Sequence, residues 1–303
     1  MKKKNIIPYI KWTFFPFLYS RTKSSEVKYF IRRSLLEQNI LHLKEPGSTH
    51  DRYCDHDIIV SLTTYGKRLY EVHLTIESIM EQTLKANRIV LWIDNSLKDK
   101  RLPVSLERLQ DRGLEIRYCK DIRSYTKLIP SLKAFPDDAI ITVDDDILYD
   151  FDVLERLING HIESPKLILA NRMHFIKKKS NGQIDHYNKW NQYVKQYEAH
   201  PNNFPTGVGG VLYPPQCFDE EVFRDDIFLD ICKYADDIWF KAMALKKGTL
   251  SKSVFTKNAK GEDYLMNDDV QDVGLKQINV NKSLNDKQFN AVFERYDLIK
   301  KLK

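Results

Sequence analysis

Cysteine and glycine are both scarce in this chain. Its 303 residues include 4 cysteines and 11 glycines. The cysteines (Cys54, Cys119, Cys217 and Cys232) lie far apart, with no Cys-x-x-Cys pair and no Cys/His spacing of a zinc motif. This pattern excludes a disulfide framework, and we expect four reduced thiols, as in a cytoplasmic protein.

A long hydrophobic run and a strong excess of charge are also missing. Lysine and arginine total 48 against 42 acidic residues, and the net charge is +6. Basic residues gather at 2–4, at 177–179 and at the C-terminal end, but no nucleic-acid-binding module accompanies them. We therefore expect no nucleic-acid partner.

The N-terminal stretch of residues 6–19 is rich in aromatic and aliphatic residues. It contains Pro8, Lys11 and Pro16, is too short to span a bilayer, and lacks the pattern of a signal peptide. Its aromatic residues beside lysines favour either contact with a membrane interface or packing on the protein's own core. Peripheral contact with the cytoplasmic face of an inner membrane is one expectation.

Short β-branched runs alternate with amphipathic segments along the chain. Predicted strands cover residues 58–62, 89–93, 114–118 and 139–143. Predicted helices cover residues 72–82, 104–112 and 126–135, and Pro130 interrupts the last of them. This alternation predicts an α/β fold with a mostly parallel central sheet flanked by helices.

We expect three parts in the chain. Residues 1–50 form an N-terminal extension with helical spacing at 27–43, and residues 51–255 form the main domain. Residues 256–303 form a closing segment with a helix at 287–303.

Polar residues follow the predicted strands where those strands end. Ligands of parallel sheets bind outside the carboxyl ends of the strands. Thr63, Asp94 and an aspartate triplet should therefore share one edge of the sheet.

The triplet of Asp144, Asp145 and Asp146 directly follows a buried strand. Three adjacent carboxylates repel one another unless a cation offsets their charge. On an extended segment Asp144 and Asp146 project to the same side, which suits Mg²⁺ or Mn²⁺. A calcium loop does not fit, since Leu148 and Tyr149 occupy its fifth and sixth positions. Solvated aspartates at a strand end are the simpler alternative.

The run of residues 140–146 resembles the Asp-x-Asp motif of GT-A glycosyltransferases, and residues 58–68 resemble their first nucleotide-binding strand and loop. The similarity covers roughly residues 55–250 and is to bacterial family-2-like transferases of surface-polysaccharide synthesis. It implies the GT-A fold and a nucleotide-diphosphate sugar donor, with a UDP-sugar favoured. It also implies Asp146 as metal ligand, supported by Asp144 and Asp145.

The same resemblance implies positions for the donor. Thr63, Tyr65 and Asp94 match positions that bind the base and ribose. Arg68 and Lys127 are candidates for the diphosphate, since both offer charge-assisted donors. An ordinary surface role is the alternative for each.

Two later segments complete the expected site. Gly209 and Gly210 belong to a glycine-rich loop that lies under the donor sugar in the resembling family. Asp236 and Asp237 open a helix, and the pair resembles the catalytic acidic pair of inverting GT-A enzymes. Capping of the helix is the simpler alternative for Asp236. The resemblance implies Asp237 as the general base of an inverting transfer.

The acceptor side is less well marked. Arg172, His174 and Trp190 are candidates for lining an acceptor groove, with packing as the alternative. The resemblance implies a glycan or a lipid-linked saccharide as acceptor. No histidine follows His200, so a histidine metal ligand near the C-terminus is not expected.

Three other functions compete with glycosyl transfer. A sugar nucleotidyltransferase would have a richer glycine loop after its first strand than residues 63–68 provide. A phosphoesterase would have more histidine or carboxylate ligands. A non-catalytic glycan- or partner-binding relative would keep the fold without turnover.

Overall fold

The computed structural model describes residues 16–258, 263–266 and 284–303, with side chains from residue 26 onward. The stretch predicted to touch a membrane, residues 1–20, therefore lies outside the described side chains, as do the lysines at positions 2–4.

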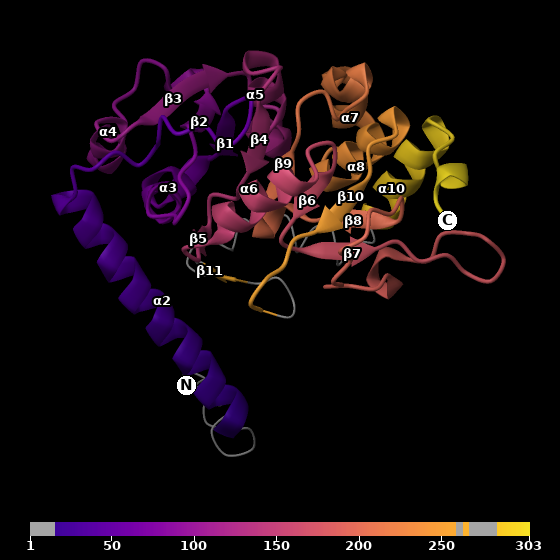
Figure 1. The fold of residues 1–303 in the computed structure, drawn as a ribbon, viewed down its shortest axis with the longest axis horizontal. Coiled ribbons are helices and arrows are strands. Elements are labelled where there is room, and N and C mark those ends of the chain that lie inside the picture. Colours follow the sequence, from indigo (N-terminus) through magenta and orange to yellow (C-terminus); the bar gives the residue numbers. More distant parts are fainter. Residues whose placement is uncertain (1–15, 259–262, 267–283) are drawn as a thin grey trace, which may run out of the picture.

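A seven-stranded sheet forms the centre of the protein (Figure 1), in the order β10-β6-β9-β4-β1-β2-β3. Its strands are β1 (Ile58–Thr63), β2 (Arg88–Asp94), β3 (Leu114–Cys119), β4 (Ala139–Thr142), β6 (Ile168–Ala170), β9 (Val211–Tyr213) and β10 (Ser251–Ser253). Only β9 among them runs antiparallel to its neighbours β4 and β6. The predicted α/β fold with a mostly parallel sheet is confirmed.

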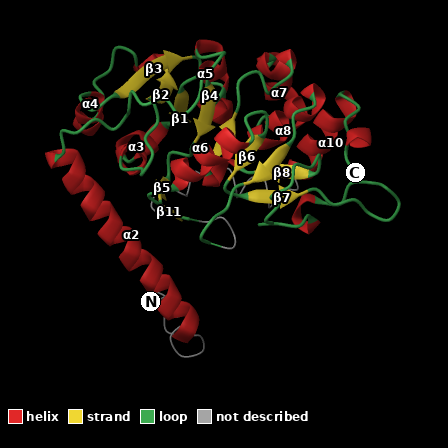
Figure 2. Ribbon diagram, viewed as in Figure 1, coloured by secondary structure: helices red, strands yellow, loops and turns green. Residues whose placement is uncertain are grey.

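Helices cover both faces of this sheet (Figure 2). Ile58, Val60 and Leu62 of β1 share a core with α3 (Val72–Met80), α4 (Val104–Gln110) and α6 (Val153–Glu163). Ile59, between them, belongs to a second core with α5 (Ile129–Ala134), α7 (Asp225–Ile231), α8 (Asp236–Lys247) and α10 (Leu284–Arg295). Successive side chains of a strand point to opposite faces, so a strand buried on both faces reads as a continuous apolar run.

Two small sheets stand beside the main one. Strand β7 (Met173–Phe175) pairs with β8 (Asn203–Pro205), and β5 (Ile147–Tyr149) pairs with β11 (Tyr264–Met266). The chain after residue 255 thus returns to the strand that follows the aspartate triplet. The division of the chain at residues 50 and 255 stays a prediction.

The interruption predicted for the helix over residues 126–135 is confirmed. The segment is divided into η3 (Arg123–Lys127) and α5, because Pro130 fits only the first turn of an α-helix. The extended geometry assumed for the aspartate triplet was wrong. Asp145 and Asp146 lie in a turn between β4 and β5, not on an extended segment.

The long N-terminal helix α2 (Pro16–His42) extends away from the body of the protein (Figure 1). Leu36 is fully buried against the body, and Arg33 pairs with Glu71 of the loop before α3. Five apolar side chains of the helix are more than half exposed: Val27, Phe30, Ile31, Leu35 and Leu41. Among the described helices, none combines the length and apolar character that crossing a membrane requires.

Candidate active site

Five carboxylates, which we call the acidic cluster, lie where β4 ends and α8 begins. They are Asp144, Asp145, Asp146, Asp236 and Asp237. Two basic side chains contact them from other segments of the chain, Arg68 of η1 (Gly66–Tyr70) and Lys127 of η3. Residues far apart in sequence therefore meet at the carboxyl edge of the sheet, as predicted for parallel strands.

Arg68 neutralises two of the triplet carboxylates. Its Nη1 lies 2.8 Å from Asp145 Oδ1, and its Nη2 lies 3.0 Å from Asp146 Oδ2. All three residues are buried. Burial raises the pKa of Asp145 to about 6, although the attraction of Arg68 opposes this and the charge of Asp146 adds to it. The pairing explains how the turn holds adjacent carboxylates; contact of Arg68 with a diphosphate stays a prediction.

Lys127 joins the triplet to the start of α8. Its Nζ lies 3.0 Å from Asp144 Oδ1 and 3.1 Å from Asp236 Oδ2. Burial alone would lower the pKa of Lys127, but Asp144, Asp236 and Asp237 outweigh it and hold that pKa well above its usual range. Lys127 is therefore a fixed positive charge, and its contact with a diphosphate also stays a prediction.

A chain of hydrogen bonds inside the sheet fixes the backbone of Lys127. Trp92 Nε1 donates to Ser131 Oγ at 2.7 Å, and the hydroxyls of Ser131 and Ser61 lie 2.7 Å apart. Ser61 Oγ then donates to the carbonyl of Lys127 at 2.6 Å. The sequence analysis did not identify Ser61 as part of the site. Its position as a polar residue within an otherwise apolar strand was the feature that could have indicated this role.

Tyr149 links the triplet turn to the glycine-rich loop. Its fully buried phenol accepts a hydrogen bond from the backbone N–H of Asp144 at 2.9 Å and donates one to the carbonyl of Val208 at 3.2 Å. Sequence reasoning missed this role too, because nothing in the pattern connects residue 149 to residue 208.

Gly207 is the glycine nearest the acidic cluster, and it was not among the predicted site residues. A Cβ atom there would lie 2.9 Å from Lys127 Nζ and 3.3 Å from Asp237 Oδ1. The absence of a side chain lets the loop backbone approach these groups. By contrast, Gly209 packs beside Arg172 and Asn171, and Gly210 faces Leu157 and Val153 of the core. Donor binding by Gly209 and Gly210 stays a prediction.

Asp236 and Asp237 occupy the first turn of α8. The alternative that Asp236 acts as N-cap was wrong: Ala235 holds that position, and the Asp236 carboxylate pairs with Lys127 instead. A catalytic role of Asp236 stays a prediction. Asp237 is partly buried and accepts a hydrogen bond from the backbone N–H of Gly207 at 3.2 Å. Burial raises the pKa of Asp237, the charge of Asp236 raises it further, and Lys127 opposes both.

The residues predicted to bind the base and ribose lie along the ends of β1 and β2. Thr63 Oγ1 donates to the carbonyl of Trp92 at 2.9 Å, and Tyr65 is half exposed. Asp94 accepts hydrogen bonds from the backbone N–H groups of Ser96 and Asp121, and those to Ser96 are the main cause of its lowered pKa. These hydrogen bonds hold the three residues at the carboxyl edge of the sheet, as expected. Their binding of a base and ribose stays a prediction.

The candidate acceptor residues are only partly suited to that role. Trp190 is 4% exposed and packs against Phe204 and Phe289, so it belongs to the core and does not line a groove. His174 is also buried, and the Arg172 guanidinium lies over the Tyr193 ring at 4.7 Å.

The acidic cluster fits a divalent cation. Its five carboxylates outnumber the two basic side chains that contact them in the described part of the chain, which leaves excess negative charge at a mostly buried place. Oxygen donors of this kind suit Mg²⁺ and Mn²⁺. Metal binding by Asp144 and Asp146, whose side chains are 29% and 11% exposed, stays a prediction.

The chain combines a mostly parallel α/β sheet with an aspartate turn at the carboxyl edge of that sheet. This is the arrangement of the GT-A transferases, the class that the sequence resemblance implied. Residues 60–213, about half of the 303-residue chain, match the family described as Glycosyl transferase family 2. The chain belongs to glycosyl transferase family 2. The match includes the triplet, Lys127 and Gly207, and it ends before Asp236 and Asp237.

Solved structures resemble the chain more distantly. The mannosyltransferase PcManGT of Pyrobaculum calidifontis, solved with GDP-Man and Mn²⁺, is 16% identical over 78% of this chain and 64% of its own, with a TM-score of 0.40. Glucosyl-3-phosphoglycerate synthase of Mycobacterium tuberculosis, solved with Mn²⁺, UDP and phosphoglyceric acid, is 13% identical over 38% of this chain and 43% of its own, with a TM-score of 0.30.

The inositol-1-phosphate CTP transferase of T. maritima is 12% identical over 75% of this chain and 98% of its own, with a TM-score of 0.38. The match with PcManGT spans less than two thirds of that protein's length. At these TM-scores none of the three structures bears on the substrate of this chain. No curated protein sequence matches it.

Replacing Lys127 by methionine removes the charge between the carboxylates and keeps an apolar stem. In a buffer with chelator, we expect the variant to lose about 3–5 kcal/mol of unfolding free energy at pH 8. The loss should be smaller at pH 5. Without Lys127, the pKa of Asp237 in the folded protein rises further. A carboxyl whose pKa is raised by folding stabilises the fold while it is protonated at low pH, and this contribution is lost as pH rises through the raised pKa.

Urea unfolding of both proteins at the two pH values measures this difference. The matched control is Lys133→Met, which removes an exposed lysine from α5 and should change stability little at either pH. An equal loss at pH 5 and pH 8 in Lys127→Met would contradict the electrostatic explanation.

Proposed function

We propose that the protein transfers a glycosyl group from a nucleotide-diphosphate sugar to a hydroxyl group of a glycan or lipid-linked acceptor. One observation carries the proposal: Lys127, Gly207, Asp237 and the aspartate turn converge at the carboxyl edge of the sheet. The convergence supports a site in which positive charge, carboxylate oxygens and a candidate base lie within reach of one bound molecule.

Mg²⁺ or Mn²⁺ held by Asp144 and Asp146 would supply Lewis-acid stabilisation of the negative charge that develops on the leaving diphosphate. Arg68 holds Asp145 and Asp146 in place. Lys127 keeps its positive charge beside Asp144, so it also offsets charge on the leaving group. We propose a UDP-sugar as donor, with Thr63, Tyr65 and Asp94 at the base and ribose.

Asp237 is the proposed general base. Its raised pKa brings the carboxylate closer to neutral pH, where a base is most effective. The acceptor oxygen attacks the anomeric carbon as the bond from that carbon to the diphosphate oxygen breaks, and Asp237 takes the hydroxyl proton. Attack from the face opposite the leaving group inverts the anomeric configuration.

Thermal unfolding with a panel of nucleotides and nucleotide sugars, with and without Mn²⁺, tests the donor site. A ligand at about 100 times its dissociation constant adds about 2.7 kcal/mol to stability. We expect one nucleotide series to stabilise the protein only when metal is present, and Asp146→Asn to abolish that effect. Asp137→Asn, which changes an exposed aspartate before β4, should behave as wild type.

Other outcomes of this panel favour the rival functions. Stabilisation by no nucleotide at all would point to a non-catalytic glycan-binding relative. Release of pyrophosphate from a nucleoside triphosphate and a sugar phosphate would point to a sugar nucleotidyltransferase.

Replacement of Asp237 by asparagine tests the base. We expect kcat to fall about 10²–10⁴-fold, the usual contribution of general base catalysis, while metal-dependent nucleotide binding is kept. Wild-type activity should rise with pH through the pKa of Asp237, because the base must be ionised, and the variant should lack this rise.

Asp226→Asn is the control, because Asp226 is exposed and pairs only with Arg224 in the contacts described. NMR of the product should show the anomer opposite to that of the donor. A product with the donor's configuration would contradict the role of Asp237 as base in a single displacement.

We also propose that the protein acts in surface-polysaccharide synthesis at the cytoplasmic face of an inner membrane. The supporting features are the apolar, lysine-flanked N-terminal sequence and the exposed lysines Lys300 and Lys303. Each basic residue near an anionic surface adds about 1 kcal/mol of attraction.

Flotation with anionic and neutral vesicles tests the membrane contact. We expect binding to anionic vesicles to fall at least tenfold when residues 1–20 are deleted and Lys300 and Lys303 become glutamine. Substitution is preferable to truncation at this end, because Leu302 is buried. Unchanged binding of this variant to anionic vesicles would contradict the proposed membrane contact.

A further inference from the structure

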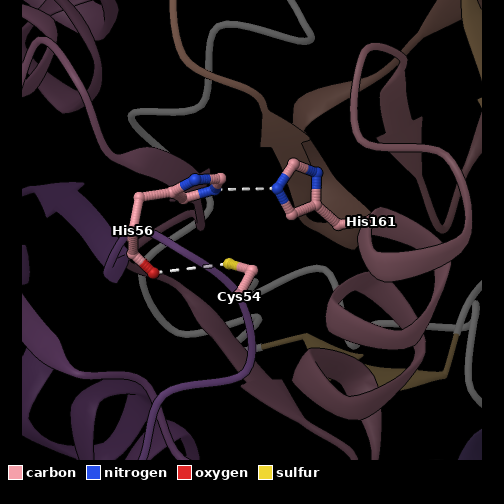
Figure 3. A group of neighbouring side chains, drawn as sticks. All are labelled: Cys54, His56 and His161. Carbon is pink, nitrogen blue, oxygen red and sulfur yellow. Dashed lines mark hydrogen bonds between the residues drawn. The ribbon is translucent and has the colours of Figure 1, made fainter.

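Cys54, His56 and His161 form a cluster at the other end of β1 from the acidic cluster (Figure 3). Cys54 and His56 lie in the loop just before β1 begins at Ile58, and His161 lies in the last turn of α6. The active-site residues described above follow the end of β1 at Thr63. The cluster is therefore separate from the proposed donor site.

The three side chains converge on one point. Their potential ligand atoms, one sulfur and two ring nitrogens, all lie within 4.8 Å of one another. His56 Nε2 and His161 Nε2 face each other at 2.9 Å, and Cys54 Sγ lies 3.3 Å from the His56 carbonyl (Figure 3). His161 is 1% exposed, while Cys54 and His56 are partly exposed and open a route from solvent.

Asp55 orients the His56 ring for metal binding. Its Oδ1 lies 2.8 Å from His56 Nδ1, so the ring proton is held on Nδ1 and the Nε2 lone pair points towards His161. Metal-binding histidines usually donate their second ring N–H to a carboxylate in this way. His161 Nδ1 has no hydrogen-bond partner among the described residues, so the ring's polar contact is on its Nε2 side.

In a hydrogen bond between the two rings, one Nε2 must carry a proton and the thiol of Cys54 takes no part. A cation between the three atoms would use both lone pairs and the sulfur.

We propose that Cys54, His56 and His161 bind one Zn²⁺ ion, with a water molecule in the fourth position. Thiolate and imidazole are the ligands zinc prefers, and three protein ligands with one open position are a known zinc arrangement. Bonds of roughly 2.0–2.3 Å in a tetrahedron set ligand atoms about 3.3–3.6 Å apart. The present spacing needs small shifts of the rings and a movement of the Cys54 side chain.

His56 and His161 are 105 residues apart, so their spacing carries no recognisable motif. Bound zinc would tie the segment that enters β1 to α6. The proposal is independent of the proposed glycosyl transfer.

Zinc titration of the full chain, stripped with a chelator and then dialysed, tests the site. We expect one tightly bound equivalent by competition with a chromophoric chelator, a higher unfolding temperature with zinc, and a cobalt–thiolate absorption band when Co²⁺ replaces zinc. Cys54→Ser and His161→Gln should each weaken zinc binding at least 100-fold, and Cys54→Ser should abolish the cobalt–thiolate band.

Two control variants make the result specific. Cys119→Ser removes another partly exposed thiol and should keep zinc binding, and Asp146→Asn should keep it too because the acidic cluster is a separate site. Because His161 is buried, Cys54→Ser at a partly exposed position serves if His161→Gln fails to fold. Absence of the tight equivalent in wild type, its retention in Cys54→Ser, or its loss in Asp146→Asn would overturn the proposal.

Discussion

The ammonium group of Lys127, held between Asp144 and Asp236, is the interaction on which the candidate site depends. The acidic cluster gathers five carboxylates at a mostly buried place, where like charges repel strongly and water screens them little. Arg68 offsets the charge of the triplet turn on one side, and Lys127 offsets it on the other. Without both cations, the turn after β4 and the start of α8 would not lie so close together.

The sheet itself positions this lysine. Ser61 is a polar residue in the middle of β1, and burying its hydroxyl would be unfavourable without hydrogen-bond partners. Its bonds to Ser131 and to the Lys127 carbonyl satisfy it and fix the backbone of η3 above the sheet. Gly207 then leaves room for the ammonium group from the opposite side. The arrangement of charges thus follows from a hydroxyl inside the core and a missing side chain in a loop.

The sequence predicted the main strands and their common edge, because buried β-branched runs and the direction of parallel strands are local or general properties. It did not predict Ser61, Tyr149 or Gly207 as site-building residues, because their roles come from contacts between distant segments. Asp236 was misjudged for the same reason: a capping rule considers only the helix, whereas Lys127 attracts its carboxylate. Trp190 was misjudged because an aromatic residue in a polar stretch gives no sign of what will cover it.

Strand β1 separates two donor sets of different chemistry. Beyond its carboxyl end lie the carboxylates of the acidic cluster, whose oxygens suit hard cations such as Mg²⁺ and Mn²⁺. Before its amino end lie a thiol and two imidazoles, which suit zinc and bind those hard cations weakly. The strand is paired with β2 on one side and β4 on the other, so the two sets are held apart by a rigid element. A response to manganese would therefore report on the acidic cluster alone. Zinc also binds carboxylate oxygens, so a zinc response belongs to the Cys/His end only where it depends on Cys54.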